Sequence, residues 1–198
     1  MYKYVIIGIV VLIIFFILTE TFFKGFIGET MISINLKKLI KKQGFVINNL
    51  IIEENDKSNQ MDHILISKKG IFCVETKNYS GTIYGDDKRK EWTQVFNFGK
   101  QKYNFYSPVF QNKNHIRSLN NIIKDYNINN VVIFYNNNID NIDSKYVYTV
   151  KSFKKYYLSL NDIITEEDVN KIYSILKNIK DNQISNKKHL ENIKKNQK

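Results

Sequence analysis

The 198-residue sequence predicts an α/β domain preceded by one N-terminal transmembrane helix. Three observations support this: an unbroken apolar run at the N-terminus, apolar residues at helical spacing in three later segments, and short β-branched runs between polar or glycine-containing turns. A chain of this length is expected to bury one hydrophobic core. The predicted parts are an anchor at residues 1–23, the domain at 24–160, a helix at 161–184 and a basic, disordered tail at 185–198.

The N-terminal segment is predicted to cross a membrane. Residues Tyr4–Leu18 carry no charge, and Phe22 and Phe23 extend the apolar segment toward the length of about 20 residues that a spanning helix needs. A cleaved signal peptide fits less well because no small-x-small cleavage site follows, and a buried core helix would not be apolar all round. Five lysines follow the run closely whereas only Lys3 precedes it. The positive-inside bias therefore predicts a single-pass protein of the cell membrane, with residues 4–23 in the bilayer and the domain in the cytoplasm.

The other elements are predicted from apolar periodicity and turn signals. Strands are expected at residues 45–53, 60–67, 71–77 and 130–135, with weaker candidates at 81–84, 92–98 and 146–150. Helices are expected at residues 28–43, 108–126 and 165–179. Pro108 introduces the second helix, and Thr165 with Asp168 resembles a capping box that opens the third. Residues 136–143 form a predicted polar loop.

Charge and cysteine content restrict the possible functions. The formal net charge of +11 favours a polyanionic partner, either nucleic acid or acidic lipid headgroups, although a solvated basic surface gives the same composition. The single cysteine, Cys73, excludes an internal disulfide, and its apolar neighbours predict a buried structural role. Three histidines without zinc-ligand spacing argue against a zinc site. No glycine-rich phosphate-binding loop is present, which disfavours a nucleotide-binding enzyme.

One predicted hairpin carries the charged residues with the clearest chemistry. Glu75 and Lys77 share a strand face because side chains alternate, and a two-residue turn at Lys68-Lys69 or at Lys69-Gly70 puts Asp62 on the same face. Burying such charges is costly unless they pair with each other or bind a metal. Two carboxylates suit Mg²⁺ or Mn²⁺. A cross-strand ion pair at a solvated strand end is the alternative interpretation.

Three further side chains are candidates for the same site. Glu29 shares a helical stripe with Ile32, Leu36 and Ile40, so it is predicted to face the sheet; a first-turn glutamate that only favours the helix dipole is the alternative. Gln111 and His115 are four residues apart on the helix after Pro108 and so share a face. They are placed to contact phosphate or water, although an ordinary hydrogen-bonding role for the histidine is the alternative.

These residues, in this order, resemble the nuclease-related domain family, NERD. The resemblance covers about residues 25–135. It rests on Gly28-Glu29, Gln60-Met61-Asp62-His63, the run from Gly70 to Asn78, and then Gly81, Trp92 and Pro108 with Gln111 and His115. The family is assigned to the PD-(D/E)xK nuclease-like superfamily, which implies a mixed central sheet flanked by helices. Met61 stands where the superfamily name has proline, a position that contributes backbone shape and no ligand.

The resemblance also implies an activity: membrane-anchored, metal-dependent hydrolysis of phosphodiester bonds in nucleic acid. It implies Mg²⁺ or Mn²⁺ bound by Asp62 and Glu75, and a catalytic set made up of Lys77, Asp62, Glu75, Glu29 and Gln111. The expected partner is nucleic acid, DNA in preference to RNA. The alternative hypothesis is a catalytically inactive nuclease-like module that binds nucleic acid or a protein partner at the membrane.

Overall fold

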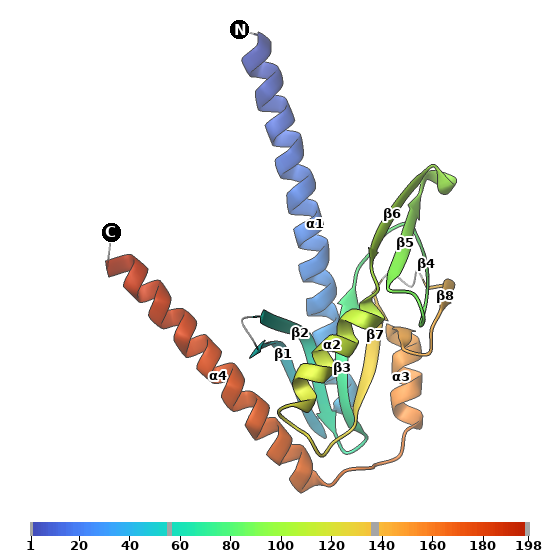
Figure 1. Cartoon of the computed structure of the whole chain (residues 1–198), viewed down its shortest axis with the longest axis vertical. Helices are drawn as coiled ribbons and strands as arrows, with labels where there is room; N and C mark the ends of the chain where they lie inside the picture. The colour runs from blue at the N-terminus through green and yellow to red at the C-terminus, as the bar shows by residue number, and fades with distance from the viewer. Residues whose placement is uncertain (1, 55–56, 136–138, 197–198) are drawn as a thin grey trace.

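The computed structural model describes residues 2–54, 57–135 and 139–196, without the side chains of residues 2, 5, 8, 10–22, 57 and 184–196. Figure 1 shows its helices and strands. In chain order they are α1 (Tyr2–Ile40), β1 (Gly44–Glu54), β2 (Lys57–Ser67), β3 (Gly70–Lys77), β4 (Thr82–Asp86), β5 (Glu91–Phe96), the short 3₁₀ helix η1 (Asn97–Gly99), β6 (Gln101–Tyr106), α2 (Pro108–Asn120), β7 (Ile128–Phe134), β8 (Asn141–Asp143), β9 (Val147–Thr149), α3 (Val150–Ser159) and α4 (Glu166–Asn196).

The central sheet is mixed, as expected from the family resemblance. Its strand order is β1-β2-β3-β7-β9. The first three strands are antiparallel neighbours, whereas β7 is parallel to β3 and β9 is parallel to β7. Every residue of β3 except Lys77 is buried, because helices cover both faces of this central strand.

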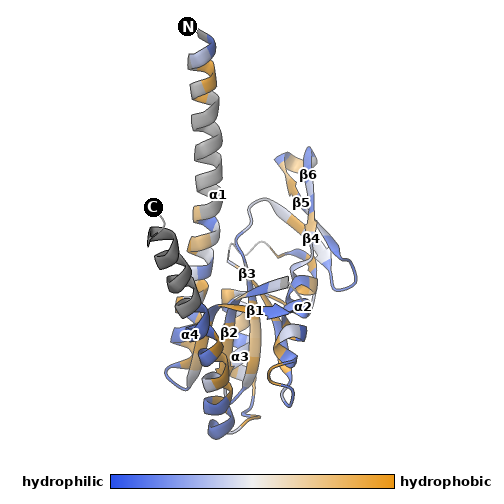
Figure 2. Cartoon of the chain, turned by 60° about the vertical axis from the view of Figure 1, so that its left-hand side comes forward, coloured by the Kyte–Doolittle hydropathy of each residue, from blue (hydrophilic) through white to orange (hydrophobic). Residues whose placement is uncertain are grey.

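Each face of the central sheet has its own hydrophobic core. On one face Ile64, Ile66 and Cys73 pack against Leu119 of α2 and Leu176 of α4. The other face packs against α1 and α3; its core includes Leu65, Phe72, Val74, Ile32, Leu36 and Phe153. Neighbouring strand residues thus enter different cores, as side-chain alternation requires. Figure 2 shows apolar residues concentrated where the central strands meet the helices.

A smaller sheet of order β6-β5-β4-β8 stands beside the central one. Its apolar face joins the body through Ile83 and Trp92, which pack with Val109 of α2 and Phe134 of β7. Gly85 leaves room for the indole, because a Cβ at that position would lie 2.2 Å from a Trp92 ring atom. The sheet is therefore anchored at its base, while β5 and β6 extend away from it as a hairpin (Figure 1).

The predicted anchor and the predicted first helix form one continuous helix, α1, which ends where Lys41 and Lys42 adopt left-handed conformations (φ 44° and 69°). Most side chains of the predicted anchor, residues 1–23, lie outside the described residues. Within the part that is described, no helix is sufficiently long and apolar to span a bilayer.

Several element boundaries differ from the predictions. The strand β6 and the helix α3 were not predicted, and α2 ends at Asn120 instead of near Tyr126. The end of the predicted polar loop at residues 136–143 forms the short strand β8, because Asn141–Asp143 pair with β4. Helix α4 begins after Thr165, whose hydroxyl accepts a hydrogen bond from the Asp168 backbone N–H (3.0 Å), in agreement with the predicted cap. The helical backbone of α4 continues to Asn196, so most of the tail predicted to be disordered, residues 185–198, is helical. The side chains of residues 184–196 lie outside the described residues.

Candidate functional site

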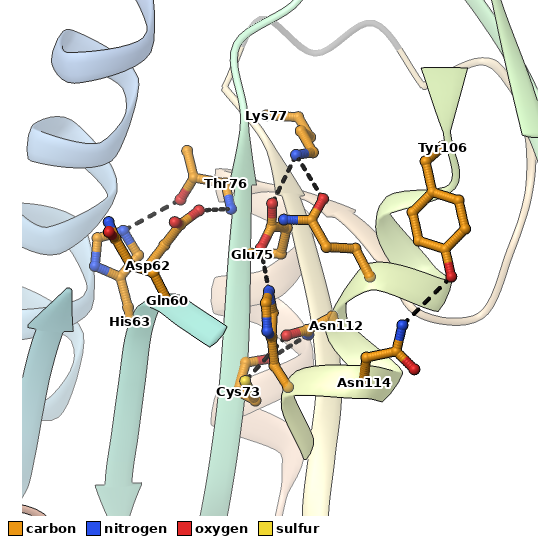
Figure 3. A network of polar contacts seen from close by, with 12 residues as sticks. Gln60, Asp62, His63, Cys73, Glu75, Thr76, Lys77, Tyr106, Asn112 and Asn114 are labelled. Atoms are coloured by element: carbon orange, nitrogen blue, oxygen red, sulfur yellow. Dashed lines mark hydrogen bonds and ion pairs between the residues drawn. The ribbon is translucent and has the colours of Figure 1, made fainter. Parts of the chain in front are cut away.

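The β2–β3 hairpin brings the carboxylates of Asp62 and Glu75 to the same end of the central sheet. Pairing runs from Ser67↔Gly70 to His63↔Val74 around a two-residue turn at Lys68-Lys69. Continued by one residue, it sets Asp62 opposite Glu75, as the first of the two predicted turns requires. One Asp62 oxygen, Oδ2, accepts a hydrogen bond from the Thr76 backbone N–H (2.8 Å). In the view of Figure 3, the Asp62 side chain lies to the left of the β3 ribbon, and the Glu75 and Lys77 side chains lie to its right.

Lys77 connects the sheet to helix α2. Its ammonium donates to Glu75 Oε1 (2.6 Å) and to Gln111 Oε1 (3.1 Å). Pro108 and the Ser107 N-cap begin α2 beside the carboxyl end of β3, so that Gln111, in the first turn of the helix, reaches the lysine. The structure therefore brings together Asp62, Glu75, Lys77 and Gln111 from three separate elements.

The second Glu75 oxygen lacks a hydrogen-bond partner. Glu75 is 2 % exposed, and His115 Nε2 lies 3.6 Å from Glu75 Oε2, which is longer than a hydrogen bond. Among the described atoms, neither Oε2 nor either ring nitrogen of the buried His115 has a hydrogen-bond partner. Because buried polar atoms are normally satisfied, these three atoms mark a place where a water, an ion or a substrate group would bind.

The pKa values of the two principal carboxyl groups, Asp62 and Glu75, shift in opposite directions. Burial, together with the nearby Glu75 charge, raises the pKa of Asp62 to about 7. Burial also acts to raise the pKa of Glu75, but the adjacent His115 ring and the Lys77 ammonium outweigh it and hold that pKa below its usual value. Burial disfavours the charged Lys77, yet the Glu75 carboxylate keeps the lysine pKa above its usual value. Near neutral pH the site therefore holds an ionised Glu75, a protonated Lys77 and an Asp62 close to its midpoint.

Helix α1 supplies the remaining carboxylate, Glu29. The helix passes close to the end of β3: Asn78 Nδ2 donates to the Lys24 carbonyl (2.6 Å), and a Cβ on Gly28 would lie 2.9 Å from the Asn78 Cβ. The partly buried Glu29 lies within electrostatic reach of the site, since burial and then Glu75 raise its pKa. Its expected inward direction agrees with this placement.

A buried asparagine that the sequence analysis missed holds α2 in place. Asn112 Nδ2 donates to the Cys73 carbonyl (2.7 Å), to Asn130 Oδ1 (2.8 Å) and to the Val131 carbonyl (3.1 Å). These bonds connect α2 to both β3 and β7, next to Gln111. The available signal was its position: Asn112 falls on the apolar stripe of α2 that Val109 and Leu119 define.

The His63 side chain lies on the face of the sheet opposite to Asp62, as its strand position predicts. Its ring nitrogens lie 2.8 Å from Asn48 Oδ1 and 3.1 Å from Thr76 Oγ1, and Asn48 Nδ2 donates to Ser33 Oγ of α1 (2.8 Å). Burial lowers the pKa of His63 to about 4, so the ring is neutral at physiological pH. This network ties α1 to the sheet behind Asp62.

The two carboxylates fit a divalent cation. No group of three or more His, Cys, Asp and Glu side chains suited to a metal occurs among the residues that the structure describes. Mg²⁺, however, is commonly held by one or two carboxylates, with water and phosphate as its other ligands. Glu75 Oε2 has no hydrogen-bond partner among the described atoms, and burial with the Glu75 charge raises the pKa of Asp62, so each carboxyl keeps an oxygen or a proton that a cation could replace or engage.

Comparison with known proteins assigns the chain to a family. The family model described as the nuclease-related domain, NERD, matches residues 24–135, which is more than half of the chain. An uncharacterized protein of Bacillus anthracis is 40% identical over 103 residues, covering 51% of this chain and 47% of the relative, so the chain spans about half the length of that relative. No solved structure matches the chain. The matched segment contains Glu29, Asp62, Glu75, Lys77 and Gln111, and on this match the chain belongs to the nuclease-related NERD family.

Proposed function

We propose that the protein is a membrane-anchored nuclease that hydrolyses phosphodiester bonds of nucleic acid, DNA in preference to RNA, with Mg²⁺ or Mn²⁺ held by Asp62 and Glu75. The observation that carries the proposal is the buried Glu75, which keeps one oxygen without a hydrogen-bond partner beside a second carboxyl of raised pKa. Family membership supports a nuclease-related role. The metal requirement, the reaction and the substrate are parts of the proposal.

Lys77 is the residue best placed to act on a phosphate. An ammonium has three donor hydrogens, and Glu75 and Gln111 accept two of them. The third is available for a phosphate oxygen or an attacking water. Because Lys77 keeps its proton, it would stabilise negative charge that develops on the phosphoryl group. Gln111 fixes the direction of the ammonium and contributes no charge.

The two carboxylates have different roles in this proposal. Glu75 is ionised and fixed by Lys77, so it provides a permanent negative charge, whereas the pKa of Asp62 allows it to lose its proton when a cation arrives. A divalent ion bound there would polarise the phosphoryl oxygen and lower the pKa of a coordinated water. Glu29 lies within electrostatic reach of Glu75 and Lys77 and would add a further negative charge to the site when it ionises.

A second candidate function is an inactive nuclease-like module that binds nucleic acid or a protein partner. One observation favours it: Lys77 contacts Glu75 directly at 2.6 Å, so the glutamate charge is already neutralised without a metal. A buried ion pair of this kind can be purely structural.

A cleavage assay separates the two candidates. The full chain in detergent is incubated with DNA and with RNA, with Mg²⁺, with Mn²⁺ or with chelator, and product lengths are measured. We expect metal-dependent cleavage by the wild type and by the control Lys155→Ala, which alters an exposed lysine of α3, and none by Lys77→Ala. Cleavage that persists in Lys77→Ala, or its absence from the wild type with both metals, would overturn the nuclease proposal. Salt-sensitive binding without cleavage would support the second candidate.

The proposed anchor comprises residues 4–23, with the domain on the cytoplasmic side of the cell membrane. Its support is the uncharged run Tyr4–Leu18 and the lysines that follow it. Full-length protein is expected to stay with membranes after alkaline carbonate extraction, and a C-terminal tag should resist protease added outside intact cells. Release by carbonate would contradict the anchor, and digestion of the tag would contradict the orientation.

A further inference from the structure

The β5–β6 hairpin is an arm with a fixed base and a free tip. At its base Trp92 is buried, its indole N–H donates to the Asp86 carbonyl (3.0 Å), and its ring packs edge-on against Phe105. The strands remain paired as far as Phe96 and Gln101. Figure 1 shows the hairpin extending well beyond the body, so its tip is presented to the surroundings on a stable support.

The tip displays an apolar side chain in a strained turn. Asn97, Phe98 and Gly99 all have left-handed backbone conformations (φ 51°, 54° and 95°), and the Phe98 side chain is fully exposed. Glycine and asparagine tolerate the left-handed conformation but phenylalanine does not, and exposing the Phe98 ring to water is unfavourable as well. Backbone strain and an exposed aromatic ring at the same residue indicate that the side chain has a binding role.

The residues around the tip suit an anionic surface. Lys100 and Lys102 follow the turn, and exposed Tyr103 lies beside them. The sequence between Glu91 and Asp125 contains no acidic residue. An aromatic group flanked by lysines and tyrosine matches the composition of protein segments at the headgroup layer of a bilayer, where rings enter the interface and ammonium groups contact anionic lipids.

The direction of the hairpin selects the membrane as its partner. In both Figures 1 and 2 the hairpin extends from the body in the same general direction as the N-terminal half of α1, which contains the proposed anchor. Single-stranded nucleic acid would also suit aromatic and basic groups. However, Phe98 lies at the end of the hairpin remote from α2, whereas a strand bound for cleavage must reach Lys77.

We propose that the Asn97–Gly99 tip is a second membrane contact, in which Phe98 enters the interfacial layer of the anionic bilayer that holds α1, and Lys100 and Lys102 lie against its headgroups. The proposal rests on the anchor proposed above. Together the two contacts would fix the rotation of the domain about α1, and so the direction in which the Lys77 end of the sheet faces.

A tryptophan reporter at the tip tests this contact. The full chain carrying Phe98→Trp is reconstituted in vesicles of phosphatidylcholine and phosphatidylglycerol, with and without brominated acyl chains. Trp92, buried in the core, gives a constant background. The matched control is Ile163→Trp, which places the reporter at an exposed apolar position in the connection between α3 and α4, at the other end of the body from the tip (Figure 1). We expect a shift of Phe98→Trp emission to shorter wavelength and a loss of intensity with brominated lipid, both absent from the control and reduced by Lys100→Glu with Lys102→Glu.

The possible failures are distinguishable. Emission from Phe98→Trp that matches the exposed control, in chains that float with the vesicles, would overturn the tip contact and leave the anchor intact. Chains that do not float with vesicles would overturn the anchor, and the tip contact with it. A Phe98→Trp signal that responds to an added oligonucleotide but not to brominated lipid would assign the tip to nucleic acid. The cleavage assay is independent of all three results.

Discussion

Replacing Asp62 by asparagine is expected to stabilise the protein at neutral and alkaline pH. On folding, burial and the Glu75 charge raise the pKa of this carboxyl from 3.8 to about 7. Below pH 3.8 it is protonated in both the folded and the unfolded chain. As the pH rises from there to about 7, the unfolded chain loses its proton first, so the stability of the wild type falls. Asparagine removes this cost and still offers an oxygen to the Thr76 N–H.

The size of the effect follows from the pKa change. At about 1.4 kcal/mol for each pH unit, ionised Asp62 costs the fold roughly 4 kcal/mol above pH 7. The hydrogen bond that Thr76 N–H donates to a neutral amide oxygen is weaker by about 1 kcal/mol than the one to the carboxylate, which leaves a gain of about 3 kcal/mol near pH 8. In a chain of this size, thermal unfolding followed by circular dichroism should then show a melting temperature raised by about 6–12 °C. Near pH 5 the gain should shrink to below about 1 kcal/mol.

The control is Asp86→Asn, because the hydrogen bond from Arg89 holds the pKa of Asp86 below its usual value and the substitution should give no gain. Saturating Mg²⁺ or Mn²⁺ is expected to raise the melting temperature of the wild type and not that of Asp62→Asn, since a ligand stabilises only the state that binds it. The reasoning fails if Asp62→Asn is less stable than wild type near pH 8, or if its gain is the same at both pH values.

Three further predictions concern the surroundings of the site. Asn112→Ala leaves buried acceptors on β3 and β7 unpaired and should cost roughly 2–3 kcal/mol in urea unfolding; no measurable loss would mean that water replaces the amide. Gly28→Ala places a Cβ 2.9 Å from the end of β3 and should cost about 1–2 kcal/mol, whereas Gly25→Ala meets open space and should gain up to about 1 kcal/mol; equal effects would show that α1 does not approach the sheet so closely. In the Asp62→Asn variant, stability should fall by up to roughly 3 kcal/mol between pH 6.5 and about 4, because only the unfolded chain protonates His63 in that range; a further His63→Gln change should flatten the curve.

The sequence predicted the central part of the fold because the β2–β3 hairpin has strong local signals. Apolar runs on both sides of Lys68-Lys69-Gly70 predict two strands and a tight turn, and strand alternation then brings Asp62 toward Glu75. The buried Cys73 follows from the same pattern. Strand β6 lacks such a pattern, since Phe105 is its one residue that is not exposed, and only pairing with β5 specifies it.

Other features depend on contacts that local patterns do not contain. The capping box of Thr149 with Ser152 opens α3, but the sequence analysis assigned Thr149 and Val150 to a strand and predicted no helix after them. The role of Asn112 depends on carbonyl groups of two distant strands, so its place on an apolar stripe was the one available signal. Likewise, the unpaired Glu75 oxygen is visible only once α2 has been placed against β3.

The continuity of α1 makes the anchor and the site a single mechanical unit. The helix runs without a break from the N-terminal segment through Glu29 to Ile40, so no flexible linker separates the proposed anchor from Glu29. The helix itself sets the height and direction of this carboxylate relative to the proposed bilayer. Each residue inserted between Phe23 and Glu29 would raise the site by about 1.5 Å and turn it by about 100°. One added residue would therefore turn the whole domain, Glu29 included, by about 100° relative to the anchor, and about seven would restore its heading two turns farther from the bilayer. The length of this segment is consequently under a phase constraint that a flexible tether would not impose.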